Sequence, residues 1–265
     1  MILQAALVAV LLAQAPAATA PEGIDDATAV RLLESGRITK IKTLSKGVTR
    51  PRRVTLTDGA LTHDAVFQNV DEEKQIERFA SGRVELGFRD SYQFNIAASR
   101  LARILGLEGM VPPCIARVVD GNRGSLCWWV TWKWDEQMRV KAKLQPPNPL
   151  AWQRQWDTSR VFTALVEDTD RNQTNMLITA EWHLWAVDFS RAFRTSHELS
   201  TRDRLHRCPK ALLERLRTLD EAAIRAAVGD HLRPNEVTAI AVRRRLIVEH
   251  FDNLVKQKGE VGVLF

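Results

Sequence analysis

The sequence lacks several features that would place a chain in a specialised class of protein. Beyond residues 1–20 it has no apolar run long enough to cross a membrane, and it has no internal repeats or low-complexity tracts. Its cysteines number only three and show no C-x-x-C spacing, which excludes the usual zinc-binding frameworks. What is present is a chain of 265 residues with 45% hydrophobic content, enough for a packed core. That length suits one large domain or two lobes that share a cleft.

The charge of the chain is moderately one-sided. Its formal net charge is +6 at pH 7, and its isoelectric point is near 9.5. This excess favours anionic partners, such as nucleotide phosphates, lipid head groups or nucleic acid, without choosing among them.

The first twenty residues contain no charged side chain and carry an apolar run followed by small residues. Ala15-Pro16-Ala17 has the small-x-small pattern of a cleavage site. We interpret residues 1–20 as a signal peptide, which predicts an exported protein in the periplasm or outside the cell. The alternatives are an uncleaved membrane anchor and a misassigned start codon. The mature chain is expected to have no transmembrane segment.

The three cysteines leave the disulfide pattern open. An odd number in an exported protein leaves at least one thiol free. Cys114 and Cys127 lie on two segments that we expect to be neighbouring strands, so they could pair. The favoured interpretation is that all three, Cys208 included, are buried apolar side chains.

Apolar periodicity divides the rest of the chain into strands and helices. Strands are expected around 54–56, 65–67, 114–119, 124–132, 176–178 and 183–187, and helices over 21–36, 90–107, 150–167, 209–219, 221–232 and 233–258. The last helix carries three consecutive arginines, which we interpret as a solvated face.

One stretch brings together residues that could carry chemistry. Asp170 and Asn175 are five residues apart, close enough to share one tight loop. The apolar segments 176–178 and 183–187 predict a hairpin, which would return the chain so that Asp188 lies beside Asn175. One amide and two carboxylates would then converge. Kinase-type phosphoryl transfer needs such a set: a base for the acceptor hydroxyl and oxygen ligands for a metal ion.

These residues carry a resemblance to a known group of enzymes. The segments DRNQTN and VDFSRAF resemble the D-R-H-x-x-N and I-D-(F/H)-G motifs of phosphatidylinositol 3/4-kinase-like and HipA-like atypical kinases. The resemblance implies that Asp170 is the catalytic aspartate and that Asn175 and Asp188 are metal ligands. Asn172 stands where those families have histidine, and Ser190 where they often have glycine.

The same comparison shows a paired departure. The families place a phosphate-binding lysine at the end of a strand, in an A-x-F-K pattern, where this chain has Gln68. The glutamate that pairs with that lysine is replaced by Asn95. Two amides can still hydrogen-bond each other, so the change predicts a retained pocket without its charge. Alternatively, Lys46 or Lys74 supplies the cation, or one of the glutamates between residues 72 and 85 is the substitute carboxylate.

The segment LSKGVTRPRRVTL occupies the position of a kinase glycine-rich loop but contains only Gly47. Lys46 and the arginines that follow would supply positive charge where backbone amides usually surround the phosphates. The resemblance therefore implies a nucleotide site that includes Lys46, Gly47, Gln68 and Asn95. The alternative interpretation of this segment is an ordinary solvated basic hairpin.

Together these observations predict an α+β, two-lobed protein-kinase-like fold, with resemblance over about residues 40–250. We expect a β-rich N-lobe over 21–140 and a mostly helical C-lobe over 141–265. The resemblance implies an atypical kinase that uses ATP and Mg²⁺ or Mn²⁺ with a protein, lipid or small-molecule acceptor; no specific nucleic-acid partner is expected. The alternatives are an exported pseudokinase that binds nucleotide or a partner without turnover and, less favoured, a metal-dependent hydrolase.

Overall fold

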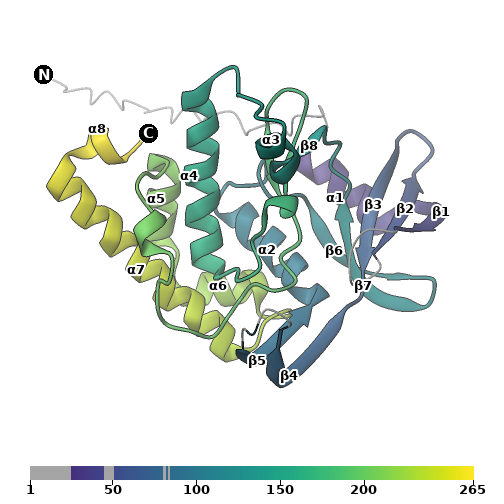
Figure 1. Ribbon diagram of the computed structural model, residues 1–265. Coiled ribbons are helices and arrows are strands. Elements are labelled where there is room, and N and C mark those ends of the chain that lie inside the picture. The colour runs from purple at the N-terminus through teal and green to yellow at the C-terminus, as the bar shows by residue number, and fades with distance from the viewer. Residues whose placement is uncertain (1–24, 45–50, 80–81, 83) are drawn as a thin grey trace, which may run out of the picture.

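The computed structural model describes residues 25–44, 51–79, 82 and 84–265. The predicted two-lobed α+β architecture is confirmed, because a β-sheet lobe lies on one side of a mostly helical lobe (Figure 1). The predicted boundary between residues 140 and 141 falls within a short helix and stays a prediction. The expected signal peptide, Lys46 and Gly47 lie outside the described residues.

The strands are β1 Arg37–Thr43, β2 Arg52–Thr57, β3 Thr62–Gln68, β4 Asp71–Arg78, β5 Val84–Ser91, β6 Cys114–Val119, β7 Asn122–Trp128, β8 Trp134–Asp135, β9 Met176–Ile178 and β10 Leu184–Ala186. The helices are α1 Asp26–Ser35, α2 Tyr92–Ile104, α3 Glu136–Lys141, α4 Pro149–Val166, α5 Lys210–Thr218, α6 Glu221–Val228, α7 Pro234–Lys258 and α8 Glu260–Val263, with single 3-10 turns η1 Gln173–Asn175 and η2 Arg202–Arg204. Among the described residues, none of these helices combines the length and apolarity needed to cross a bilayer.

The N-lobe is built on a five-stranded antiparallel sheet with the order β1-β2-β3-β7-β6. Alternate residues of its central strands face inward: Val54 and Leu56 in β2, and Ala65 and Phe67 in β3, are buried. They pack in one cluster with α1, for example with Leu32. The strand period of two therefore produces a sheet with one apolar face, and α1 covers that face.

Helix α2 joins the two lobes. Ser91 caps its first turn, and most of its side chains are buried in the larger core that the C-lobe helices share. Ile96 and Leu101 are buried as predicted, whereas Ile104 is 41% exposed. Asn95 is 4% exposed, so this helix presents a buried polar group to the space between the lobes. Such a group must be hydrogen-bonded to be tolerated there.

The basic run in α7 is only in part the solvated face predicted from the sequence, because Arg245 is exposed and Arg244 half-buried, whereas Arg243 departs from the prediction. Arg243 is fully buried, and its Nε donates to the carbonyl of Leu165 at 2.8 Å. Its Nη1 donates to the Glu167 carboxylate at 3.0 Å and to the carbonyls of Arg194 and Ser196 at 2.8 and 2.6 Å. Burial lowers the pKa of Arg243 to about 10. The side chain is buried because one guanidinium satisfies the carbonyls of two segments that approach α7.

Strands β6 and β7 are joined by a disulfide. Cys114 and Cys127 are directly opposite each other in the ladder and form the bond. The pairing that the sequence left open is therefore the observed one, and the favoured interpretation of buried thiols was wrong for this pair. Cys208 is a free and buried thiol, and burial raises its pKa to about 12.

Replacing both Cys114 and Cys127 with serine is expected to lower the free energy of unfolding by about 2–3 kcal/mol. The bond closes a loop with a sequence separation of 13 residues, and releasing it returns conformational freedom to the unfolded chain. Urea unfolding with and without reductant measures the effect. The double variant should be insensitive to reductant, whereas a parent protein that reductant also leaves unchanged would contradict the expectation.

Candidate functional site

The predicted hairpin is confirmed and brings the two ends of the motif together. Strands β9 and β10 pair antiparallel, with Met176 opposite Ala186. One residue further along, the Val187 backbone N–H donates to the Asn175 carbonyl at 3.0 Å. Asn175 therefore lies beside the residue that precedes Asp188, as the sequence spacing predicted.

Arg171 fixes the loop on which these residues lie. Its Nη1 donates to the carbonyls of Asn175 and Val187 at 3.1 and 2.6 Å, and its Nη2 forms an ion pair with Asp168. The guanidinium also lies over the ring of Phe189, with 4.2 Å between Cζ and the ring centroid. One half-buried arginine thus holds the Asp170 loop, residues 167–175, against the strand end that leads to Asp188.

Asp170 lies at the exposed tip of this loop. Its backbone N–H donates to the Asp168 carboxylate at 3.0 Å, and its carbonyl accepts from the Asn172 amide at 3.2 Å. Asn172 in turn accepts from the Thr174 backbone N–H at 2.9 Å, which starts the η1 turn. Local hydrogen bonds therefore shape the loop, and Asp170 is exposed to solvent.

Asp188 has an unusual backbone. Its φ is +57°, in the left-handed region that few residues other than glycine adopt, although aspartate tolerates it better than most. Its carboxylate accepts from the Ser190 N–H at 3.4 Å, and the next N–H, that of Phe189, donates to Asn95 at 2.7 Å. A strained residue held by its neighbours at a predicted functional position is a common mark of a site.

Gln68 and Asn95 contact each other, as the sequence predicted. The Nδ2 of Asn95 donates to Oε1 of Gln68 at 2.7 Å, while its Oδ1 accepts from the Phe189 N–H. The amide of Asn95 therefore bridges the end of β3 to the segment that begins at Asp188. Neither contact requires a charge, so a neutral bridge occupies this position. Its role in nucleotide binding stays a prediction.

Asp90, at the end of β5, is a neighbour of Asp188 that the sequence analysis missed. Burial raises the pKa of the Asp90 carboxyl, and the charge of Asp188 adds to the rise, whereas Ser190 lowers it through a hydrogen bond. Its Oδ1 is buried and has no hydrogen-bond partner among the described residues. A buried carboxylate oxygen beside a second carboxylate is the environment that a cation would stabilise.

Of the two lysines that the sequence offered as a substitute cation, Lys74 lies within the described residues and Lys46 does not. Lys74 pairs with Glu77 at 2.7 Å and with Glu72 at 3.5 Å on the exposed face of β4. The ammonium of Lys74 therefore pairs with glutamates of β4 and not with Gln68 or Asn95. Within the described part of the chain, no group of three or more His, Cys, Asp or Glu side chains is arranged to hold a metal ion. The candidate donors are the two carboxylates Asp90 and Asp188 and the amide of Asn175.

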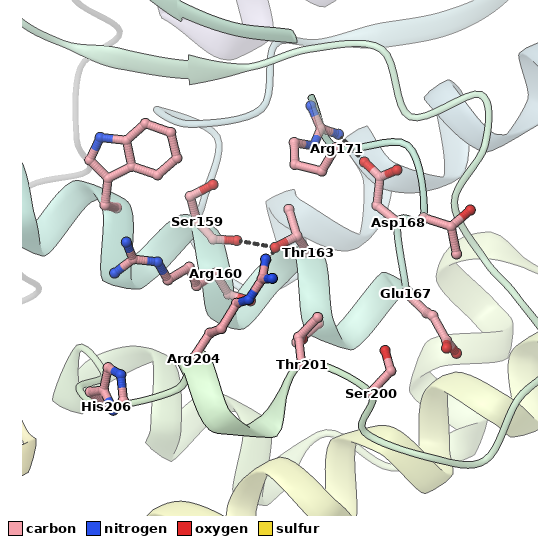
Figure 2. A pocket seen from close by; sticks show the side chains of 13 residues that line it. Ser159, Arg160, Thr163, Glu167, Asp168, Arg171, Ser200, Thr201, Arg204 and His206 are labelled. Carbon is pink, nitrogen blue, oxygen red and sulfur yellow. Dashed lines mark hydrogen bonds and ion pairs between the residues drawn. The ribbon is translucent and has the colours of Figure 1, made fainter. Parts of the chain in front are cut away.

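A hollow of roughly 720 Å³ opens beside the Asp170 loop (Figure 2). Its walls come from α4, from the Asp170 loop and from the segment that contains η2; they are Trp156, Ser159, Arg160, Thr163, Ala164, Glu167, Asp168, Thr169, Arg171, Ser200, Thr201, Arg204 and His206. A second hollow of roughly 390 Å³ shares Trp156, Arg160 and Arg171 with it, so the two adjoin along α4.

The charges of this hollow are mostly neutralised internally. Glu167 pairs with Arg243, and Asp168 pairs with Arg171. Arg204 has no side-chain hydrogen bond or ion pair to any described residue, and Figure 2 shows its side chain extending toward Thr163 on α4. Hydroxyl groups and one uncommitted cation are therefore what the hollow offers to a ligand.

Known protein families and curated protein sequences give no match to this chain. Solved structures do match. The structure of hydra Fam20 with sugar has a TM-score of 0.65 at 15% identity and covers 91% of this chain and 92% of its own. The Golgi casein kinase has a TM-score of 0.62 at 14% identity, with 91% and 79% covered. The Helicobacter pylori proinflammatory kinase CtkA has a TM-score of 0.55 at 10% identity, with 84% and 97% covered.

Likeness at these identities establishes the fold and no more. The predicted finer resemblance to phosphatidylinositol 3/4-kinases and HipA is not supported by these structures. What they support is the coarser prediction: the chain has an atypical protein-kinase-like fold.

Proposed function

We propose that this protein is a phosphotransferase that uses ATP and a divalent metal ion, Mg²⁺ or Mn²⁺. The observation that carries the proposal is the hydrogen bond between Asn175 and Val187, the residue before Asp188, with Asn175 on the same loop as Asp170. The protein-kinase-like fold supports it, because phosphoryl transfer needs a base and metal-binding oxygens in this relation.

The oxygen donors near Asp188 fit a hard divalent cation. Asn175 and Asp188 would hold it, and Asp90 would join them through the buried Oδ1 that lacks a hydrogen-bond partner. Carboxylate and amide oxygens are the ligands such ions prefer. A bound metal ion would neutralise charge on the nucleotide phosphates.

The other residues of the site orient and deprotonate. In the proposed reaction, the acceptor oxygen forms a bond to the γ-phosphorus, the bond from that phosphorus to the ADP oxygen breaks, and the hydroxyl proton passes to Asp170. Arg171 keeps the Asp170 loop in register with Asp188 through its bonds to both chain segments. Its contribution is to position rather than to react.

The acceptor in this proposal is a sugar that lies in the hollow beside the Asp170 loop. Hydroxyl side chains such as Ser159, Thr163 and Thr201 line it, and Trp156 supplies an aromatic surface. Hydroxyl-rich ligands match such walls through hydrogen bonds, with the aromatic ring packing on a sugar face. The similar hydra Fam20 structure contains a sugar. Protein and lipid acceptors are the alternatives that an acceptor panel would reveal.

Replacing Arg204 with alanine is expected to raise the KM for the acceptor about tenfold, because a charge-assisted hydrogen bond to the bound acceptor is lost. The KM for ATP should not change, since Arg204 lies at the hollow and not at the amide bridge. Steady-state kinetics measures both constants. The matched control is Arg202→Ala on the same turn, because Arg202 contacts His250 instead. Equal effects of the two substitutions would argue against the hollow as the acceptor site.

Two measurements on the purified chain test the proposed function. Thermal stabilisation by ATP should require Mg²⁺ or Mn²⁺, and labelled γ-phosphate should pass to at least one member of a panel of sugars, peptides and lipids. Failure of transfer to every member would contradict the phosphotransferase proposal.

A second candidate function is a pseudokinase that binds nucleotide or a partner without turnover. The neutral bridge between Gln68 and Asn95 favours it, because a carboxamide cannot offset phosphate charge as an ammonium does. Titration with labelled ATP separates the two functions. Binding without transfer favours the pseudokinase, and absence of binding favours a role as a scaffold for a partner.

The proposed location is the periplasm or the outside of the cell. The disulfide between Cys114 and Cys127 supports it, because such bonds persist in oxidising compartments. The proposed signal peptide lies outside the described residues.

A further inference from the structure

The segment that follows Asp188 contacts the β4–β5 hairpin. The two strands pair antiparallel from Asp71 opposite Ser91 to Arg78 opposite Val84, and the hairpin projects at the bottom of Figure 1 beside the start of α7. At its base, the Ser91 N–H donates to the carbonyl of Ser190 at 2.9 Å. The hairpin is therefore bonded directly to the chain that carries Asp188.

One carboxylate of the hairpin binds two arginines of this segment. Glu85 accepts from Nη2 of Arg191 at 2.8 Å and forms a second ion pair with Arg194. The three side chains are largely buried, with relative exposures of 15% for Glu85, 10% for Arg191 and 13% for Arg194. Ion pairs that are this shielded from water are screened far less than surface pairs.

Aromatic and backbone contacts complete the arrangement. The guanidinium carbon of Arg191 lies 4.4 Å from the ring centroid of Phe88 and 5.3 Å from that of Phe79. Arg194 also donates to the carbonyl of Gly87 at 3.3 Å. Both arginines therefore contact the hairpin through more than charge, which fixes their orientation relative to Glu85.

The hairpin is itself anchored to the C-lobe at a second place. Arg233 forms two hydrogen bonds to the Glu73 carboxylate, at 2.8 and 2.6 Å, and Arg89 pairs with the buried Glu236 of α7. Since Arg233 and Glu236 also form the first turn of α7, the hairpin is attached to a rigid element. The hairpin that carries Glu85 is therefore attached to α7 through contacts that do not involve Glu85 itself.

We infer that Glu85 is a positioning residue that takes the place of an activating phosphate. In many kinases a phosphate added to the activation segment orders it by binding arginines. Here a carboxylate already present in the chain binds Arg191 and Arg194, so the segment from Asp188 to Arg194 is ordered without modification. The consequence for metal binding rests on the proposed function, whereas the ordering of the segment does not.

Hydrogen exchange of Glu85→Gln tests this inference. The amides of Phe189, Ala192 and Phe193, which donate to Asn95, Phe189 and Val166 respectively, report on the segment. Their exchange should accelerate by at least about tenfold, the factor expected when charge-assisted bonds to one carboxylate are lost. The dissociation constant of the metal–nucleotide complex should rise by a similar factor. Unchanged exchange at these amides would overturn the inference.

The matched control is Glu77→Gln on the same hairpin. Glu77 has a similar exposure, 21%, but its partner is Lys74 and not the Asp188 segment. This variant should leave exchange and binding as in the parent. An equal acceleration in both variants would mean that the hairpin as a whole, and not Glu85, protects the segment.

Two further variants and a phosphatase treatment test whether the charge of Glu85, and not a phosphate, orders the segment. Glu85→Asp should restore part of the protection because it keeps the charge. If Glu85→Gln does not fold, Arg194→Lys, which keeps the charge but loses the planar fork, should show the accelerated exchange. Phosphatase treatment of the parent should change neither amide exchange nor metal–nucleotide binding. Faster exchange or weaker binding after the treatment would overturn the inference. A parent that binds no metal–nucleotide complex would contradict the proposed function alone, because exchange still tests Glu85.

Discussion

Replacing Asp188 with alanine is expected to abolish metal-dependent nucleotide binding while the chain stays folded. The proposed metal site would lose one of its two carboxylates, and affinity for hard cations depends strongly on the number of charged oxygen ligands. Thermal stabilisation by ATP with Mg²⁺ or Mn²⁺ should disappear. A small loss of stability, about 1–2 kcal/mol, is expected from placing alanine at a φ of +57°.

Asp188→Asn separates these two effects. Asparagine tolerates the left-handed backbone and keeps the shape of the side chain, so this variant should melt close to the parent and still fail to bind. Asp252→Ala, which removes an exposed acid paired with Arg217 on the far part of α7, is the control and should bind normally. If Asp188→Ala binds metal and nucleotide like the parent, the assignment of the motif is wrong.

Replacing Gln68 alone with lysine is expected to destabilise the protein by about 3 kcal/mol, the lower end of the scale for a buried charge without its partner, because residue 68 is only partly buried. Asn95 presents its amide N–H to residue 68 and its carbonyl oxygen to the Phe189 N–H. An ammonium at residue 68 would therefore face a donor. Turning the amide of Asn95 would not help, because the Phe189 N–H would then lose its acceptor.

Adding Asn95→Glu should recover this loss. A carboxylate can accept from the new ammonium and from the Phe189 N–H together, so every buried group is satisfied. The double variant should also bind ATP more tightly, since a fixed positive charge meets the phosphates. A thermal-melt double-mutant cycle measures the coupling. Additive effects would show that the pair does not act as a unit and would remove the basis for a kinase-like pocket at this position.

The elements that the sequence predicted correctly are those with an apolar period. The β9–β10 hairpin, α2 and α4 all bury a face against the C-lobe core. The spacing of their apolar residues therefore indicates both the type of element and the face that is buried. The β4–β5 hairpin has no such pattern, because nearly all of β4, from Asp71 to Arg78, is exposed. Cross-strand pairing and ion pairs to distant residues hold it instead, and these leave no local signal.

The same distinction divides the candidate site. Asp170, Asn175 and Asp188 lie within one short stretch, so spacing and a predicted turn were enough to bring them together. The contact between Glu85 and Arg191 joins residues 106 positions apart. Asp90 likewise approaches Asp188 only because β5 ends beside it. Contacts of this kind depend on how distant segments pack together in the folded chain. The residues around either partner in the sequence do not indicate them.

The burial of Arg243 has a consequence for the order in which the chain matures. This side chain, near the C-terminal end, satisfies carbonyls at Leu165, Arg194 and Ser196 that precede it by 78, 49 and 47 residues. Proteins are synthesised from the N-terminus, and domains begin to fold as they emerge. The Asp170 loop and the chain after Asp188 cannot reach their final arrangement until α7 has been made and has docked. An incompletely synthesised chain therefore cannot complete the proposed nucleotide site, whatever the state of its N-lobe.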